Sequence, residues 1–160
     1  MKPSVSSLLG LNLIMYIIVV IIAGWAINYG IDNTYIKASA EPLPAHLFPI
    51  YYPMGNKATG LFVLFALIAG VVGIGSLISG MLSMMKEWDL NNLALASSSA
   101  IVTWGLTLLA MGLACKEINI GGRNETLWTL EAFVIILSAT QLFYIGAVNA
   151  EMPQSTVHWP

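Results

Sequence analysis

Charged residues are scarce in this chain of 160 residues, and they gather in one segment. The chain has six Lys or Arg and eight Asp or Glu in total. Five of them fall within residues 115–133, namely Lys116, Glu117, Arg123, Glu125 and Glu131. A guanidinium grips a carboxylate through two parallel hydrogen bonds, and nearby carboxylates can hold cations in place or exchange protons. The pattern therefore suggests a binding site for a small amphipathic organic acid within this charged segment (residues 115–133).

The composition excludes an ordinary soluble domain. Hydrophobic residues make up 58% of the chain and charged residues 9%, with a mean hydropathy of +0.80. A soluble globule carries about 25% charged residues, so the solvent for most of this chain must be lipid. The net charge of −2 comes without a basic patch, which argues against nucleic acid as a partner. We expect residues 1–160 to form a single all-α domain integrated in the lipid bilayer.

The sequence contains no recognisable catalytic or metal-binding motif. Cys115 is the one cysteine, and His46 and His158 are the only histidines, so neither a disulfide nor a Cys/His zinc spacing exists. No nucleophile elbow, phosphate loop or zinc-protease motif occurs. These observations predict a protein that is not an enzyme and that uses no cofactor and no metal.

Four apolar runs are long enough to cross a membrane, which takes about 20 residues in a helix. They cover residues 8–27, 59–83, 93–115 and 127–149 and predict a four-helix transmembrane bundle. Between the first two runs lies a long Pro/aromatic loop, in which four prolines within residues 42–53 forbid a regular helix. Two interpretations stay open, a lid over a site or an interfacial loop with rings at the headgroups. The polar tail, residues 150–160, is expected to be flexible.

The second run is rich in small residues at helical spacing. Small residues four apart share a helix face and allow the backbone of a neighbouring helix to approach closely. The pattern predicts a helix-packing surface and favours a homo-oligomer, although it does not say whether the neighbour belongs to this chain or to another copy. The residues in question are Gly70, Gly73, Gly75, Ser76 and Gly80.

Polar residues on the third and fourth runs point toward the charged segment. At 100° per residue, Ser99, Thr103, Thr107 and Glu117 fall on one stripe of the third run. Glu131 and Ser138 share a side of the fourth run with Asn149, and Gln141 lies nearby. The resulting ligand-binding hypothesis comprises Lys116, Glu117, Arg123, Glu131, Thr103, Thr107 and Gln141.

A simpler interpretation remains open beside this hypothesis. Acidic residues stabilise helix N-termini, charges mark the points where helices leave lipid, and Gly121-Gly122 can simply turn the chain. The hydroxyls of the stripe can likewise bond to the preceding turn of their own helix.

Two signals disagree about topology. Lys37, Lys57, Lys116 and Arg123 share one side, which the positive-inside rule places in the cytosol. Asn124 opens an Asn-Glu-Thr glycosylation sequon on that same side, and sequons function only on the external or lumenal face. The long Pro/aromatic loop favours the second arrangement, with both termini in the cytosol.

Several motifs together resemble a known family. These are L-N-L-I-M-Y at 11–16, F-A-L-I-A-G-V-V-G at 65–73, G-L-A-C-K-E-I-N-I-G-G at 112–122 and L-E-A-F-V-I-I-L at 130–137. They resemble the plant AWPM-19-like, or PM19, membrane proteins over all four runs. The Pro-rich part of the first loop and the polar tail depart from the family pattern.

The resemblance implies a multi-pass protein of the plant plasma membrane that is tied to abscisic acid and to tolerance of drought or cold. It further implies uptake of abscisic acid, an apolar ring bearing a carboxylate, as one function. The alternative is a structural or scaffold membrane protein that accumulates in dehydration, cold or dormancy. The resemblance assigns no binding residues, so the site above rests on the sequence pattern alone.

Overall fold

The computed structural model describes residues 3–38, 55, 58–86, 90–122 and 124–150, and four long helices account for nearly all of them. The helices are α1 (Pro3–Ala38), α2 (Thr59–Lys86), α3 (Leu90–Ile120) and α4 (Glu125–Ala150). The described part of the chain contains no strand. The prediction of an all-α, four-helix membrane protein is confirmed, whereas the Pro-rich part of the loop (residues 39–54) and residues 151–160 of the tail lie outside the described residues.

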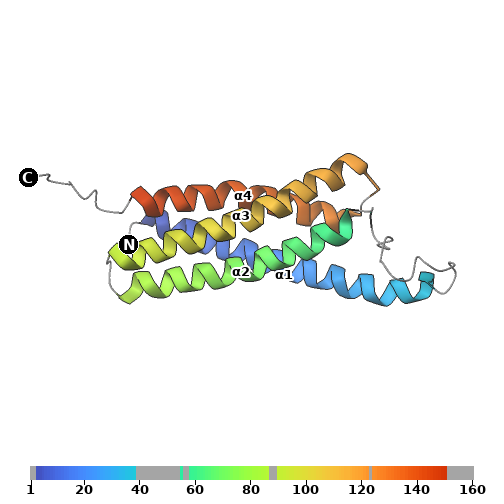
Figure 1. Cartoon of the computed structure of the whole chain (residues 1–160), viewed down its shortest axis with the longest axis horizontal. Coiled ribbons are helices and arrows are strands. Elements are labelled where there is room, and N and C mark those ends of the chain that lie inside the picture. Colours follow the sequence, from blue (N-terminus) through green and yellow to red (C-terminus); the bar gives the residue numbers. More distant parts are fainter. Residues whose placement is uncertain (1–2, 39–54, 56–57, 87–89, 123, 151–160) are drawn as a thin grey trace, which may run out of the picture.

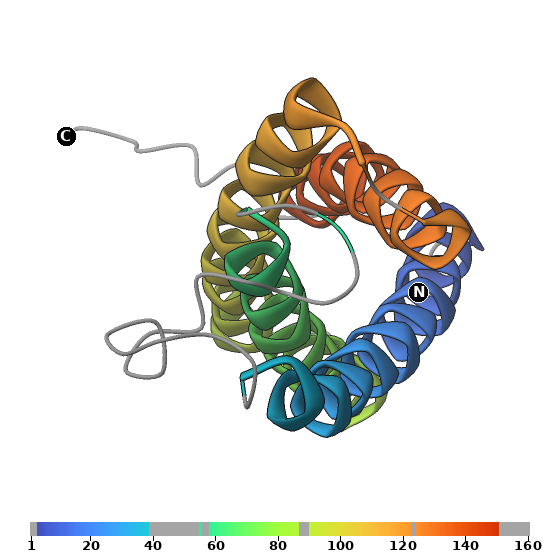
Figure 2. The same ribbon diagram turned by 90° about the vertical axis from the view of Figure 1, so that its right-hand side faces the viewer.

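The helices run alternately up and down in a ring (Figure 1). Each packs on its neighbour in sequence, and α4 closes the ring against α1 (Figure 2). The start of α1, the end of α2, the start of α3 and the end of α4 therefore share one end of the bundle. The α3–α4 connection and the start of α2 share the other. We call them the terminal end and the acidic end, because Glu117 and Glu131 lie toward the second.

All four helices are long and apolar enough to cross a membrane. The candidate spans are Ser4–Asn33, Thr59–Ser83, Ala94–Ile120 and Glu125–Ala150. Large apolar side chains cover the outside of the bundle, with Ile21, Met85 and Phe143 exposed to 64%, 70% and 66%. Such a surface would be unfavourable in water and suits contact with acyl chains.

The first helix is longer than the predicted span at both ends. It starts at Pro3 and continues to Ala38, so residues 30–38 are helical although they were predicted to belong to the connecting loop. The reason is that no proline occurs between Pro3 and Pro42. This part of α1 projects beyond the other helices (Figure 1). Near its base the exposed rings of Trp25 and Tyr29 stack with centroids 5.5 Å apart, as suits a membrane interface.

The small residues of α2 divide between the inside and the outside of the bundle. A Cβ built on Gly70 would lie 2.6 Å from Val20 Cγ2, and one on Gly73 would lie 2.7 Å from the Tyr16 ring, so α1 approaches the α2 backbone at both positions. Gly80 faces Tyr144 and Ala96. Gly75 points outward and meets nothing within 4 Å.

The connection between α3 and α4 is short because two glycines reverse the chain. Gly121 and Gly122 both have φ of 78°, a left-handed conformation that side chains disfavour. Asn124 then caps α4, since its Oδ1 accepts a hydrogen bond from the Leu127 N–H at 3.1 Å. The predicted glycosylation asparagine thus lies exposed at the first turn of a candidate span.

We predict that Gly73→Ala lowers the free energy of unfolding by about 1–3 kcal/mol, because the added methyl overlaps a ring that cannot move without losing its hydrogen bond. Equilibrium unfolding in mixed detergent micelles, followed by circular dichroism, measures this. Gly75→Ala is the matched control on the same helix and should be neutral, or stabilising by up to about 1 kcal/mol through helix propensity. Equal effects of the two substitutions would contradict the close approach of α1 and α2.

Candidate functional site

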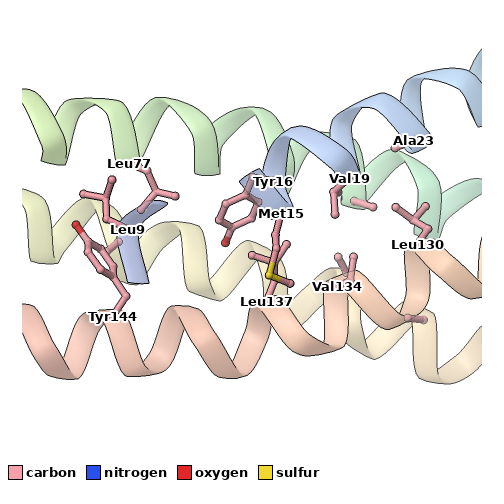
Figure 3. Packing of buried hydrophobic residues seen from close by; sticks show 14 of the residues in the cluster. Leu9, Met15, Tyr16, Val19, Ala23, Leu77, Leu130, Val134, Leu137 and Tyr144 are labelled. Atoms are coloured by element: carbon pink, nitrogen blue, oxygen red, sulfur yellow. The ribbon is translucent and has the colours of Figure 1, made fainter. Parts of the chain in front are cut away.

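Tyr16 connects three helices at the centre of the bundle. Its side chain is 1% exposed, and its ring lies against the α2 backbone at Gly73. Figure 3 shows the ring within the apolar core, where Val134 and Leu137 also pack. The phenol lies 2.9 Å from Thr107 Oγ1 on α3. The Thr107 hydroxyl donates its one proton to the Thr103 carbonyl at 2.9 Å, so Tyr16 is the donor of the bond between the two side chains.

A second polar contact joins α1 to α4 one turn away. The Asn12 side-chain N–H donates to Gln141 Oε1 at 3.0 Å, and both residues are fully buried. Gln141 Nε2 in turn points at the Ala100 carbonyl of α3, at 3.5 Å. Together with Tyr16, Thr103 and Thr107, these two amides form what we call the central polar cluster.

The acidic end carries two buried carboxyl groups. Glu117 is 0% exposed and accepts a hydrogen bond from the Thr59 hydroxyl, at the start of α2, at 2.5 Å. Glu131 of α4 is 3% exposed. Lys116 is exposed, because neighbouring residues of a helix point about 100° apart. Arg123 lies outside the described residues.

Further polar contacts continue toward the terminal end. Ser76 donates to Ser99 at 3.1 Å and so links α2 to α3. The Trp104 indole N–H donates to the Ser138 carbonyl at 2.9 Å, and Ser97 donates to Asn149 Oδ1 at 2.9 Å, both between α3 and α4. Buried polar side chains therefore occur along most of the length of the bundle.

The structure separates the predicted site residues into two groups. Thr103, Thr107 and Gln141 belong to the central polar cluster, whereas Glu117 and Glu131 lie at the acidic end. The hydroxyl stripe of the third run is the interior face of α3, and Thr103 and Thr107 also bond back to their own helix. Among the small residues, Gly70, Gly73 and Gly80 pack inside this chain, and Ser76 is half-buried.

Sequence reasoning missed Asn12, Tyr16 and Thr59 as partners of the predicted residues. A signal for the first two was present, because Asn12 and Tyr16 are four residues apart on one face of an otherwise apolar run. Thr59 offered no such signal, since it stands at the start of its run and its contact to Glu117 depends on how α2 packs on α3.

The chemistry that this interior can supply is hydrogen bonding and proton exchange. Hydroxyls and amides act as both donors and acceptors, and the carboxyl groups can bind or release a proton. The described residues contain no group of three or more metal-ligating side chains.

A four-span helical membrane protein with a polar, partly acidic interior is the class that this fold and site define. The sequence profile of the AWPM-19-like family matches residues 10–151. The chain is also 43% identical over 149 residues to membrane protein PM19L of Oryza sativa subsp. japonica, covering 92% of this chain and 78% of the rice protein. No solved structure matches it. The chain therefore belongs to the AWPM-19-like family, which confirms the resemblance seen in its motifs.

We predict that Tyr16→Phe lowers the free energy of unfolding by about 0.6–1.7 kcal/mol, the range for hydrogen bonds between membrane helices. The ring and its packing on Gly73 are retained, so the loss reports the hydrogen bond to Thr107. In a double-mutant cycle with Thr107→Val, the second substitution should cost less once the phenol is gone. Tyr29→Phe, on the exposed part of α1, is the control and should be neutral; strict additivity of Tyr16→Phe and Thr107→Val would contradict the contact.

Proposed function

We propose that the protein facilitates uptake of abscisic acid, or of a similar small amphipathic organic acid, across a plant plasma membrane. The substrate comes from what the family resemblance implies. The observation that carries the proposal is the series of buried polar side chains along the interior of a bundle whose outside is apolar. It runs from Glu117 and Thr59 through the central polar cluster to Ser97.

Buried polar groups in a membrane protein are the usual mark of a substrate or proton path, because they are costly to insert. An ionisable residue at the bilayer centre costs about 2.5–3.5 kcal/mol on insertion scales. Such residues near helix ends, as Glu117 and Glu131 are, cost less but still must be accommodated by partners. Their position at one end of the bundle suits a role in exchanging protons with an acid that enters there.

The second candidate function is a structural membrane protein that accumulates in dehydration, cold or dormancy. It is favoured by the fact that most of the buried polar groups bond one another between helices, such as Asn12 with Gln141 and Thr59 with Glu117. Bonds of this kind hold membrane helices together without any ligand. A measurement of transport separates the two functions.

We expect purified protein in liposomes to raise the uptake of labelled abscisic acid above that of protein-free liposomes at neutral pH. The protein-free rate must be subtracted because the protonated acid crosses lipid unaided. Thr107→Val and Glu131→Gln should each lower the protein-dependent rate by about fivefold to tenfold, which corresponds to about 1–1.4 kcal/mol.

The matched control for Thr107→Val is Thr129→Val. Thr129 is an exposed threonine of α4 whose hydroxyl donates to the Glu125 carbonyl of its own helix, so its replacement should leave uptake unchanged. A protein-dependent rate that is indistinguishable from zero would favour the structural function. An unchanged rate in both interior variants would exclude the polar interior as the path.

We propose further that both termini are cytosolic, so that the acidic end faces the outside of the cell. Cys115 is the only cysteine of the chain, and a Cys115→Ser background allows single reporter cysteines at exposed positions. Glu125→Cys at the acidic end should react with a membrane-impermeant thiol reagent on intact cells. Ser4→Cys at the terminal end should react only after permeabilisation, and the opposite pattern would reverse the topology.

A further inference from the structure

Asn12 presents a buried acceptor that no group in the described chain satisfies. The residue is 0% exposed, and its Nδ2 donates to Gln141 Oε1. Its other amide atom, Oδ1, is buried and accepts no hydrogen bond from the residues that the structure describes. An amide carbonyl left in this condition costs about 1–3 kcal/mol, so its position at the centre of the bundle calls for a functional explanation.

The orientation of the two amides follows from a backbone group. The Ala100 carbonyl can only accept, so Gln141 must turn its Nε2 toward it and its Oε1 toward Asn12. Asn12 must then donate its side-chain N–H to Gln141 Oε1. Rotating both amides would set Gln141 Oε1 against the Ala100 oxygen, and two acceptors repel each other. The open atom is therefore an acceptor, Oδ1, and not a donor.

An open acceptor discriminates between the two forms of a weak acid. A protonated carboxyl group carries one O–H donor, whereas a carboxylate carries acceptors alone. The O–H can bond to Asn12 Oδ1. The anion would meet the negative end of the amide dipole and would bring an unpaired charge into the bundle.

We propose that Asn12 Oδ1 binds the O–H of a protonated carboxylic acid, so that the protein carries small organic acids in their neutral form. This inference rests on the proposed function. The acid takes its proton up on the entry side and releases it to water on the exit side, so that transfer is electrically neutral. Water offers the same O–H chemistry, and the experiment below distinguishes the two.

The ionisable groups around Asn12 do not supply an alternative source of pH dependence at this level of the bundle. Tyr16 on α1 and Tyr144 on α4 are phenols, which are neutral at pH 7. Residues 59–85 of α2 and 90–114 of α3 include no ionisable residue. Glu131 lies about three helical turns from Gln141, and Glu117 lies still farther along α3 from Ala100.

The first measurement needs no variant. Liposomes with and without the protein take up labelled abscisic acid at several symmetrical pH values above the pKa of the acid. The protein-dependent initial rate should fall about tenfold for each pH unit, in step with the protonated fraction. A rate that stays level as pH rises would show carriage of the anion and overturn the inference while leaving the proposed function intact. A protein-dependent rate of zero at every pH would overturn both.

The second measurement tests Asn12 itself. Asn12→Leu should lower the protein-dependent uptake rate of the acid by about fivefold to tenfold. The uptake rate of the methyl ester of the acid should stay unchanged, because the ester has no carboxyl O–H. Asn28→Leu is the matched control, because it makes the same substitution on α1 at an exposed amide, whose Nδ2 donates to Asp32 of the same helix; it should leave both rates unchanged. If Asn12→Leu slowed uptake of the acid and of the ester equally, Asn12 Oδ1 would bind water or serve the structure of the bundle, and the inference would be overturned.

Discussion

The rest of the interior depends on the contacts of the Tyr16 side chain, which reaches from α1 past Gly73 of α2 to Thr107 of α3. An aromatic ring can lie between α1 and α3 because position 73 of α2 has no side chain, and its phenol can then reach Thr107. In lipid no hydrophobic force draws helices together, since acyl chains are as apolar as leucine. Helices in lipid must therefore associate through close packing and hydrogen bonds. The Tyr16 side chain provides both, because its ring packs on Gly73 and its phenol bonds to Thr107.

The same constraint explains why the molecule is apolar outside and partly polar inside. The side chains that face lipid, such as Ile21 and Phe143, gain nothing by being buried. The amides, hydroxyls and carboxyl groups avoid lipid by facing one another. Glu117 illustrates the result, since it is fully buried beside Thr59 while its neighbour Lys116 is exposed. A cluster of charges that is compact in the sequence is thus divided between the interior and the surface.

Asn12 is an exception to this mutual pairing of interior polar groups. Every other neutral polar side chain of the central polar cluster finds a partner within the chain, whereas Asn12 Oδ1 finds none among the described residues. A protein selected only for the stability of its bundle would gain by closing that acceptor or by replacing the amide with an apolar residue. The exception coincides with the point where α1, α3 and α4 meet.

By itself, the sequence determined the fold class, the four spans and the family, because length and hydropathy leave lipid as the solvent and backbone bonding in lipid demands helices. It also indicated the interior face of α3, since helical phase is a local property. Only the tertiary structure decided which residues meet. The pairing of Tyr16 with Thr107, of Asn12 with Gln141 and of Thr59 with Glu117 joins helices distant in the chain. The rotation of each helix about its axis and the angles at which the helices cross determine those pairs, and a local sequence pattern contains neither.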